Sequence, residues 1–339
     1  MPAGIKNMQQ ADATSWMAMF SLNMLRMSLE LATHNKAHEE SAAKFFRHFL
    51  NIAWAMHHIG KKDISLWDDK DDFYYDAVQF ENGKSQRLKI RSLVGLIPML
   101  AVEVINEDLF DQLQEFKKRA GILMRTRPDL AQLISRIEKV NEKGDQLFSI
   151  IRGYRLEYLL KRILDEDEFL SEFGIRSLSK FHLDNPFVFE NNGKKHSIQY
   201  DPGESNTYMF GGNSNWRGPI WFPLNYLIIQ AIRKYYKFYG PSYVYEFPAR
   251  SGNMLNLQEI AIELTKRLKK LFDANDQGKI NYHSDHEQYS TDEHFKNHHM
   301  FYEFFHGDNG KGLGASHQTG WTALIANLLL EQEAEKEAL

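Results

Sequence analysis

Residues 14–33, TSWMAMFSLNMLRMSLELAT, are apolar around nearly the whole circumference of a helix. A helix with this pattern is predicted to be buried on all sides. Residues 39–59 follow a 3.6-residue apolar period and end at the stop signal Gly60, which predicts a second, amphipathic helix. Residues 91–105 are again almost wholly apolar and predict a buried helix that Pro98 starts or kinks. This alternation favours a two-layer helical barrel, with a helical bundle or an α-solenoid as alternatives.

The rest of the chain continues this mainly helical pattern. A short β-hairpin is predicted over 68–90, where polar and aromatic residues alternate around Asn82-Gly83. Long loops at 174–215 and 276–300 are expected at the site end of a single domain covering 1–339. Further helices are predicted over 107–125, 128–143, 145–170, 219–239, 256–274 and 316–335.

The composition excludes several classes of function. The chain has 339 residues, a formal net charge of -4 and no basic stripe, so nucleic acid is not an expected partner. It has no cysteine, which rules out thiolate catalysis and cysteine-ligated metals and fits a reducing cytoplasm. No apolar run reaches the roughly 18 residues of a membrane span, so we expect a cytoplasmic protein without a membrane partner.

The most informative segment for chemistry is 210–226, FGGNSNWRGPIWFPLNY. It places Trp216 and Arg217 in a loop, with Trp221 and Asn225 four residues apart on the following helix. Aromatic rings pack against the faces of sugar rings, and arginine and asparagine bond to hydroxyl groups. The segment therefore predicts a wall of a sugar site, and a rigid structural loop is the alternative.

A second such segment is 301–322, FYEFFHGDNGKGLGASHQTGWT. Glu303 lies among four aromatic residues, and a glycine-rich loop follows it. His317, Gln318 and Trp321 come at the start of the last predicted helix. From the residues alone, Glu303 is equally a catalytic carboxylate or a structural one bonded to backbone amides.

Asp12 lies in the segment 9–16, QQADATSW, directly before the first predicted helix. Asp and Thr commonly cap helix N-termini, so the residues alone favour a capping role for Asp12 or Thr14.

Metal sites are not favoured. The segment 283–299 holds five histidines, of which His294 and His298 could share a metal only on a helix, and no third ligand is specified. The acidic stretch 68–76 lacks the glycine and glutamate of an EF-hand loop, although Asp76 is a candidate for lining the cleft. We predict neither a metal nor a cofactor.

Together these segments resemble glycoside hydrolase family 63, which includes the processing α-glucosidase I. The resemblance runs from about residue 8 to 328, and its most specific parts are GGNSNWRGPIWFPLNY, FYEFFHGDNGKGLGASHQTGWT, DDFYYD, RSLVGLIPMLAVE and LDEDEFLSEFGIRSLS. It implies an all-α (α/α)6 barrel of helical hairpins and hydrolysis of α-linked glucosides or oligosaccharides with inversion. The chain is similar to the C-terminal catalytic part of larger members, so we expect the barrel to be incomplete at its N-terminus and an N-terminal domain to be missing.

The resemblance also implies catalytic roles. The general acid of the family is an Asp a few residues before a Trp, the place that Asp12 and Trp16 occupy here. The general base is a Glu in the aromatic segment before the glycine-rich loop, which is Glu303. The predicted substrate-binding residues are Trp16, Arg176, Trp216, Arg217, Trp221, Asn225, His317, Gln318 and Trp321.

Three other functions remain open. A trehalase-like hydrolase or a sugar epimerase could use the same barrel, and a helical scaffold could bind carbohydrate or a partner without catalysis. The scaffold predicts that Asp12 and Glu303 do not face one pocket.

Overall fold

A computed structural model describes residues 4–58, 65–131, 140–151, 153–205, 217–275, 278–283, 286–296 and 298–337. The helices of this part of the chain are α1 (Ala11–His34), α2 (His38–His57), α3 (Glu107–Gln112), α4 (Gln114–Thr126), α5 (Pro128–Ala131), α6 (Gly153–Ile163), α7 (Phe222–Tyr239), α8 (Leu257–Lys270), α9 (Glu287–Thr291), α10 (Thr319–Thr322) and α11 (Leu324–Glu337).

The strands in the same residues are short. They are β1 (Ile5–Gln9), β2 (Trp67–Asp68), β3 (Phe73–Tyr74), β4 (Asp76–Phe80), β5 (Ser85–Leu88), β6 (Val102–Ile105), β7 (Gln146–Ser149), β8 (Leu170–Ser171), β9 (Gly174–Ile175), β10 (Phe187–Asn191), β11 (Lys194–Ile198), β12 (Val244–Glu246), β13 (Met254–Asn256), β14 (Phe304–Phe305) and β15 (Gly312–Leu313).

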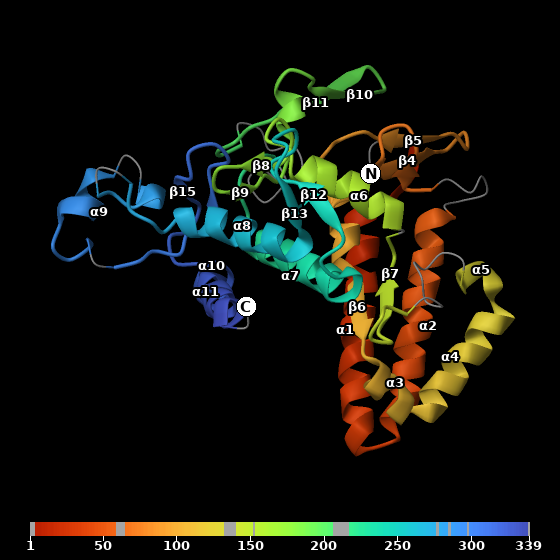
Figure 1. Cartoon of the computed structure of the whole chain (residues 1–339). Helices are drawn as coiled ribbons and strands as arrows, with labels where there is room; N and C mark the ends of the chain where they lie inside the picture. The colour runs from red at the N-terminus through yellow and green to blue at the C-terminus, as the bar shows by residue number, and fades with distance from the viewer. Residues whose placement is uncertain are drawn as a thin grey trace.

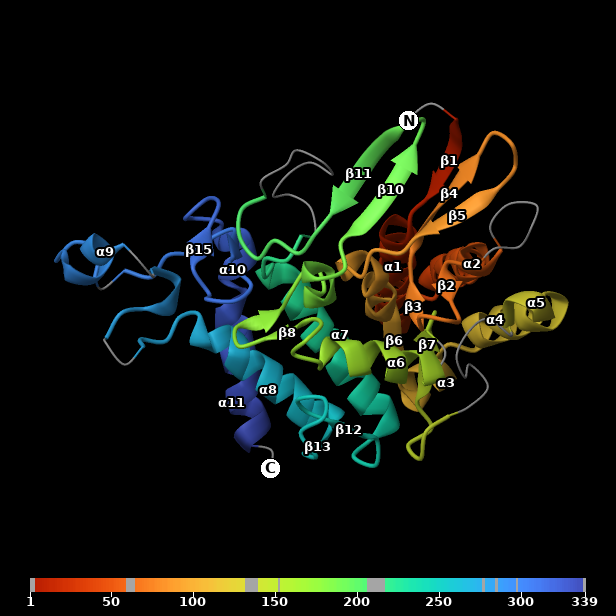
Figure 2. The same cartoon turned by 90° about the horizontal axis from the view of Figure 1, so that it is seen from above.

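The helices form two crossing groups. α1 and α2 lie side by side as an antiparallel pair, and α4 packs on α2 (Figure 1). α7 and α8 form a second pair that runs across the first, with α11 packed against both of them (Figures 1 and 2). One cluster of buried apolar side chains extends from Ala11 in α1 to Leu328 in α11, so both groups share a core. Among the described helices, none is long and apolar enough to cross a membrane.

The prediction of an all-α (α/α)6 barrel is wrong. In the described residues, fifteen strands form seven small antiparallel sheets between the helices, which makes the structure mixed α/β. The largest sheet has the order β1-β4-β5 and lies at the N-terminal end of α1. The Asn82-Gly83 hairpin within this sheet is the predicted one, with Gly83 at φ 78°.

The apolar run 91–105 accounts for part of this error. It forms two short 3-10 turns and then β6, which pairs with β7 through Val102↔Ser149 and Ile105↔Gln146. The β-branched residues of β6 suit a buried strand, and a continuous apolar run has no period that separates strand from helix.

Close packing fixes the path of this run at Gly95. A Cβ atom there would lie 2.2 Å from a ring carbon of Phe73 and 2.3 Å from the carbonyl oxygen of Tyr74. No residue larger than glycine fits at position 95, where this apolar run lies against β3.

The expectation that α1 is buried on all sides is also wrong. Leu22, Leu25 and Leu29 are at most 1% exposed, and α1 packs on α2, β6 and the 3-10 turns of the run 91–105. The opposite face carries an apolar stripe at spacings of three and four residues, each member 40–52% exposed: Met17, Phe20, Met24, Met27 and Leu31.

The other expected elements have mixed outcomes. The predicted helix 107–125 forms as α3 and α4, and the predicted helix 256–274 forms as α8, which begins with a capping box of Asn256 and Glu259. The predicted helix 145–170 is instead β7 followed by α6, and the predicted loop 174–215 contains the β10–β11 hairpin.

Candidate active site

Asp12 lies at a small cavity where β1 leads into α1. The cavity has a volume of about 150 Å³. Its lining includes Asp12, Asp76 and Arg217, together with Met8, Gln10, Leu88, Ile90, Ser92, Val94 and Ile198. The cavity therefore gathers two carboxylates and a guanidinium from three distant parts of the chain.

The antiparallel register of β1 and β4 brings the two carboxylates together. Gln9 pairs with Ala77, which places Asp76 beside the first residue of α1. An Asp76 carboxylate oxygen accepts the backbone N–H of Ala11 at 2.7 Å, whereas the N-cap residue Gln10 makes no side-chain capping bond. Asp76 thus satisfies one free amide of the helix N-terminus.

Asp12 lines the cavity and is not the N-cap residue of α1. It is the second residue of α1, it is partly exposed, and its Oδ1 accepts the Ala13 N–H at 2.7 Å. The capping role that the residues alone favoured is taken largely by Asp76, as the hydrogen bond to Ala11 shows.

Asp76 is the titratable group with the largest perturbation in this cavity. Burial is the main cause that raises the pKa of its carboxyl to about 7, and the negative charge of Asp12 raises it further. The hydrogen bond from Ala11 acts in the opposite direction but is weaker than burial. A carboxyl that titrates near neutrality therefore lies beside Asp12 and lines the same cavity.

Arg217 closes the same cavity from the other side. Its side chain is buried and donates to the Ser205 hydroxyl at 2.9 Å. Burial lowers the pKa of the guanidinium, and the nearby carboxylate of Asp201 offsets part of this effect. Trp216, which precedes it, lies outside the described residues.

Glu303 lies on a different element, directly before the β14–β15 hairpin. Its backbone N–H donates to the Ala315 carbonyl at 2.8 Å, and its Oε2 accepts the Ala315 N–H at 3.3 Å. A Cβ atom on Gly314 would lie 2.6 Å from that Oε2, and Gly314 has a φ of 68°. The glycine-rich loop therefore folds closely around a half-buried carboxylate.

Aromatic rings gather next to Glu303. Trp221 is buried and stacks on Phe304, with ring centroids 4.9 Å apart and planes at 27°. Trp321 meets Trp221 edge to face at 5.9 Å and is 39% exposed. His317 is exposed, and the backbone of Gln318 bonds to Phe301 at the start of α10. The structure thus brings four predicted residues, Trp221, His317, Gln318 and Trp321, to one region with Glu303.

The segment 217–221 joins this aromatic region to the cavity of Asp12. Arg217 lines the cavity, and Trp221 packs in the aromatic region. Between them, Ile220 forms two backbone hydrogen bonds with Phe305, of 2.7 and 2.9 Å. One stretch of five residues therefore connects the two regions, but Glu303 is not among the residues that line the cavity of Asp12.

Two predicted binding residues make only internal contacts in the described structure. Arg176 is buried and donates to the Tyr200 hydroxyl at 2.9 Å, to Asp308 at 3.1 Å and to the Leu170 carbonyl. Asn225 is 1% exposed, and its side-chain amide exchanges hydrogen bonds with the backbone of Ile175.

Trp16 has an intermediate position. It is partly buried on α1, and its ring stacks near Phe20 at 6.3 Å. It is not among the residues that line the cavity of Asp12.

The described residues contain no group of three or more His, Cys, Asp or Glu side chains arranged to hold a metal ion. Within the histidine-rich segment, His283 is buried and stacks on Tyr289 at 5.0 Å. Burial lowers the pKa of His283, and the neighbouring His286 and His299 add to the effect.

Similar proteins support the resemblance seen in the sequence. The model of the glycosyl hydrolase family 63 C-terminal domain matches residues 147–331. The chain is 45% identical over 343 residues to the uncharacterised protein YMR196W of Saccharomyces cerevisiae, an alignment that covers 96% of this chain and 31% of that protein.

Two named enzymes are more distant relatives. The mannosyl-oligosaccharide glucosidase of Saccharomyces cerevisiae is 28% identical over 177 residues, and the probable mannosyl-oligosaccharide glucosidase of Schizosaccharomyces pombe is 27% identical over 178 residues. Each alignment covers 52% of this chain and 15% of the relative. The chain thus spans less than a third of the length of any of these three proteins, and the match of more than half its residues shows that it belongs to glycoside hydrolase family 63.

Proposed function

We propose that the chain carries the catalytic residues of an inverting α-glycosidase that hydrolyses α-linked glucose from oligosaccharides or small glucosides. The observation that carries this proposal is the segment 217–221, which links the cavity of Asp12 to the aromatic region of Glu303. Family membership and the glucosidase names of two relatives support the substrate class.

In the proposed reaction, protonated Asp12 donates its proton to the glycosidic oxygen as the bond from that oxygen to C1 breaks. Glu303, ionised, takes a proton from a water molecule whose oxygen attacks C1 from the opposite face. The product sugar then has the β configuration, and the leaving group departs as a neutral alcohol. In this proposal the exposed ring of Trp321 packs against the sugar.

The proposal is tested by proton NMR of α-linked glucose disaccharides, trehalose included, during incubation with the protein. We expect the glucose from the non-reducing end of each disaccharide to appear first as the β anomer, with mutarotation following. Trehalose should give equal amounts of β-glucose and α-glucose, because its leaving glucose keeps the α configuration. Glu303→Gln is expected to release no sugar, because the amide cannot accept the proton of the attacking water. Glu293→Gln, an exposed neighbour in sequence, serves as the matched control and should behave as wild type.

Three results would contradict parts of this proposal. Early release of α-glucose without β-glucose from trehalose would exclude inversion, and equal release by Glu303→Gln would remove Glu303 as the base. Cleavage of trehalose alone would favour the trehalase-like alternative.

Asp76 gives a prediction about pH. The pKa of this carboxyl is about 7 in the folded chain and 3.8 in the unfolded chain, so the folded state binds the proton more tightly. The resulting stabilisation is fully present below about pH 3.8 and is lost as the pH rises through about 7. Asp76→Asn has no proton to lose here, so its stability does not fall in this way as the pH rises. Its amide oxygen can still accept the Ala11 N–H.

We therefore expect the Tm of Asp76→Asn, relative to that of wild type, to be higher at pH 8 than at pH 5. Thermal unfolding of both proteins across this range measures the difference. A difference in Tm that does not change with pH would show that Asp76 does not titrate in this window.

A further inference from the structure

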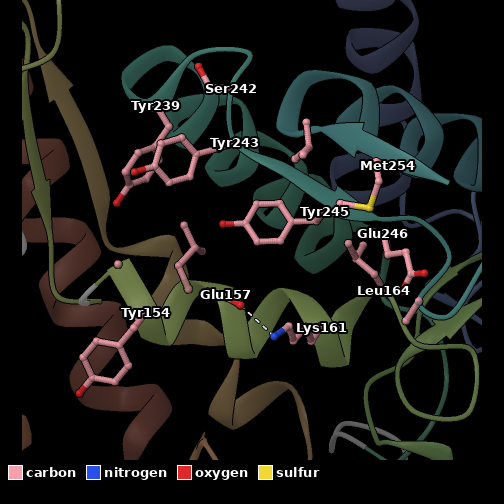
Figure 3. Close-up of a pocket in the computed structure, with 14 residues that line it drawn as sticks. Tyr154, Glu157, Lys161, Leu164, Tyr239, Ser242, Tyr243, Tyr245, Glu246 and Met254 are labelled. Carbon is pink, nitrogen blue, oxygen red and sulfur yellow. Dashed lines mark hydrogen bonds and ion pairs between the residues drawn. The ribbon is translucent and has the colours of Figure 1, made fainter. Parts of the chain in front are cut away.

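A groove lined by tyrosines lies on a part of the molecule that the proposed active site does not use. It runs between α6 and the β12–β13 hairpin that follows α7, and its volume is about 660 Å³ (Figure 3). This volume is within the range of roughly 300–1,000 Å³ that is typical of ligand sites. The residues on which the argument depends are Glu157, Lys161, Tyr239, Tyr243 and Tyr245.

The tyrosine rings offer flat apolar surface to solvent. Tyr243 is 38% exposed and Tyr245 is half-buried. The rings of Tyr239 and Tyr243 lie 4.4 Å apart on one wall, and Tyr245 points into the space between that wall and α6 (Figure 3). Such rings bind the apolar face of a sugar while their hydroxyl groups remain available for hydrogen bonds.

The charges in the groove favour a neutral ligand. Glu157 and Lys161 on α6 form an ion pair at 2.8 Å, which Figure 3 marks by a dashed line. The carboxylate of Glu246 accepts the backbone N–H groups of Arg250 and Gly252, both at 2.8 Å. The single lysine of the lining is therefore already paired, and the groove has no excess of positive charge for an anionic ligand.

The groove is separate from the proposed active site. Trp221 and the Glu303 region lie at the N-terminal end of α7, whereas Tyr239 is its last residue. At a rise of about 1.5 Å per residue, these two ends of α7 are roughly 25 Å apart. None of the residues that line the cavity of Asp12 lines the groove.

We propose that this groove is a second carbohydrate site, which binds a neutral oligosaccharide by stacking on Tyr243 and Tyr245. The Glu157–Lys161 pair and the Ser242 hydroxyl bond to hydroxyl groups of the bound sugar. A site of this kind holds a long substrate on the protein between cleavage events and so raises its effective concentration at the catalytic residues.

A proline-rich peptide is the other ligand that aromatic grooves accept. The sugar is favoured because the chain belongs to a family of glycoside hydrolases and because the polar groups of the groove are spread along its walls.

Binding of maltoheptaose, a neutral oligomer of α-linked glucose, tests the proposal by isothermal titration calorimetry. The whole chain is used with Glu303→Gln in the background, so that the ligand is not consumed. We expect Tyr243→Ala and Tyr245→Ala each to weaken binding about five- to tenfold, and Tyr243→Phe to retain it, because the ring supplies most of the contact. Tyr158→Ala is the matched control, since Tyr158 is 37% exposed on α6 but does not line the groove.

The possible results separate clearly. Loss of affinity in the two groove variants, with unchanged affinity in Tyr158→Ala and unchanged Tm in all variants, supports the second site. Failure of maltoheptaose to bind, or equal affinity in every variant, overturns it. Binding of decaproline in place of maltoheptaose also overturns it and assigns the groove to peptides. Because no cleavage is measured, these outcomes do not depend on the proposed catalytic roles.

Discussion

Replacing Asp12 by Asn is expected to lower kcat about 10²- to 10⁴-fold on α-linked glucose disaccharides, the usual contribution of a general acid. The loss should depend on the leaving group. A disaccharide releases a sugar alcohol, which must be protonated as it departs, whereas α-glucosyl fluoride releases fluoride, which needs no proton. We therefore expect Asp12→Asn to retain most of its activity on the fluoride and Glu303→Gln to lose activity on both substrates.

The fold is expected to survive this substitution. Asp12 is partly exposed, and the amide of the variant keeps an oxygen for the Ala13 N–H, so the cost to stability at the first turn of α1 is at most about 0.3–1 kcal/mol. Asp108→Asn is the matched control, because Asp108 is also the second residue of a helix, α3, and is exposed away from the cavity. Equal loss of activity of Asp12→Asn on both substrates would assign Asp12 to substrate positioning rather than to proton donation.

Long periodic helices and one turn were predictable from the sequence. α2, α7 and α8 follow patterns of apolar residues at helical spacing, and α8 also has its capping box. The Asn82-Gly83 pair predicted its hairpin because the turn needs a residue with a positive φ, which Gly83 supplies at 78°.

The strands were missed because their pairing is not local. β6 pairs with β7, which lies more than forty residues later in the chain, and neither segment contains a sequence signal that identifies the other as its partner. The exposed stripe on α1 was missed for a related reason: a helix that is apolar all round does not show which of its faces the fold covers.

The candidate site was predictable only in part. The composition of the aromatic segment singled out Glu303, and the structure brings Trp221 and Trp321 to it. Asp76 was noticed in the sequence, but its position beside Asp12 depends on the register of β1 and β4. Arg176 was predicted to bind substrate because it lies in a loop segment, and sequence cannot show that Tyr200 and Asp308 surround its guanidinium.

Asn225 is a second predicted binding residue whose contacts cannot be read from the sequence, and its substitution is expected to lower the stability of the fold strongly. Its side-chain Oδ1 accepts the Ile175 N–H at 2.7 Å, and its Nδ2 donates to the carbonyls of Ile175 at 3.0 Å and Trp221 at 3.1 Å. The amide thus makes the two hydrogen bonds to β9 that a neighbouring strand would make, and it connects β9 to α7. A sugar hydroxyl could reach this group only by displacing one of these bonds in a position that is 1% exposed.

We therefore expect Asn225→Ala to lower the free energy of unfolding by about 2–5 kcal/mol, because the buried N–H and carbonyl of Ile175 both lose their partner. Urea unfolding measures this loss, which is a large fraction of the roughly 5–15 kcal/mol that stabilises a typical domain. Asn327→Ala is the control, since Asn327 also makes two side-chain hydrogen bonds but is exposed, so its loss should cost about 0.5 kcal/mol or less. An unchanged urea midpoint for Asn225→Ala, combined with a weaker affinity for sugar, would return Asn225 to the substrate-binding role that the sequence predicted.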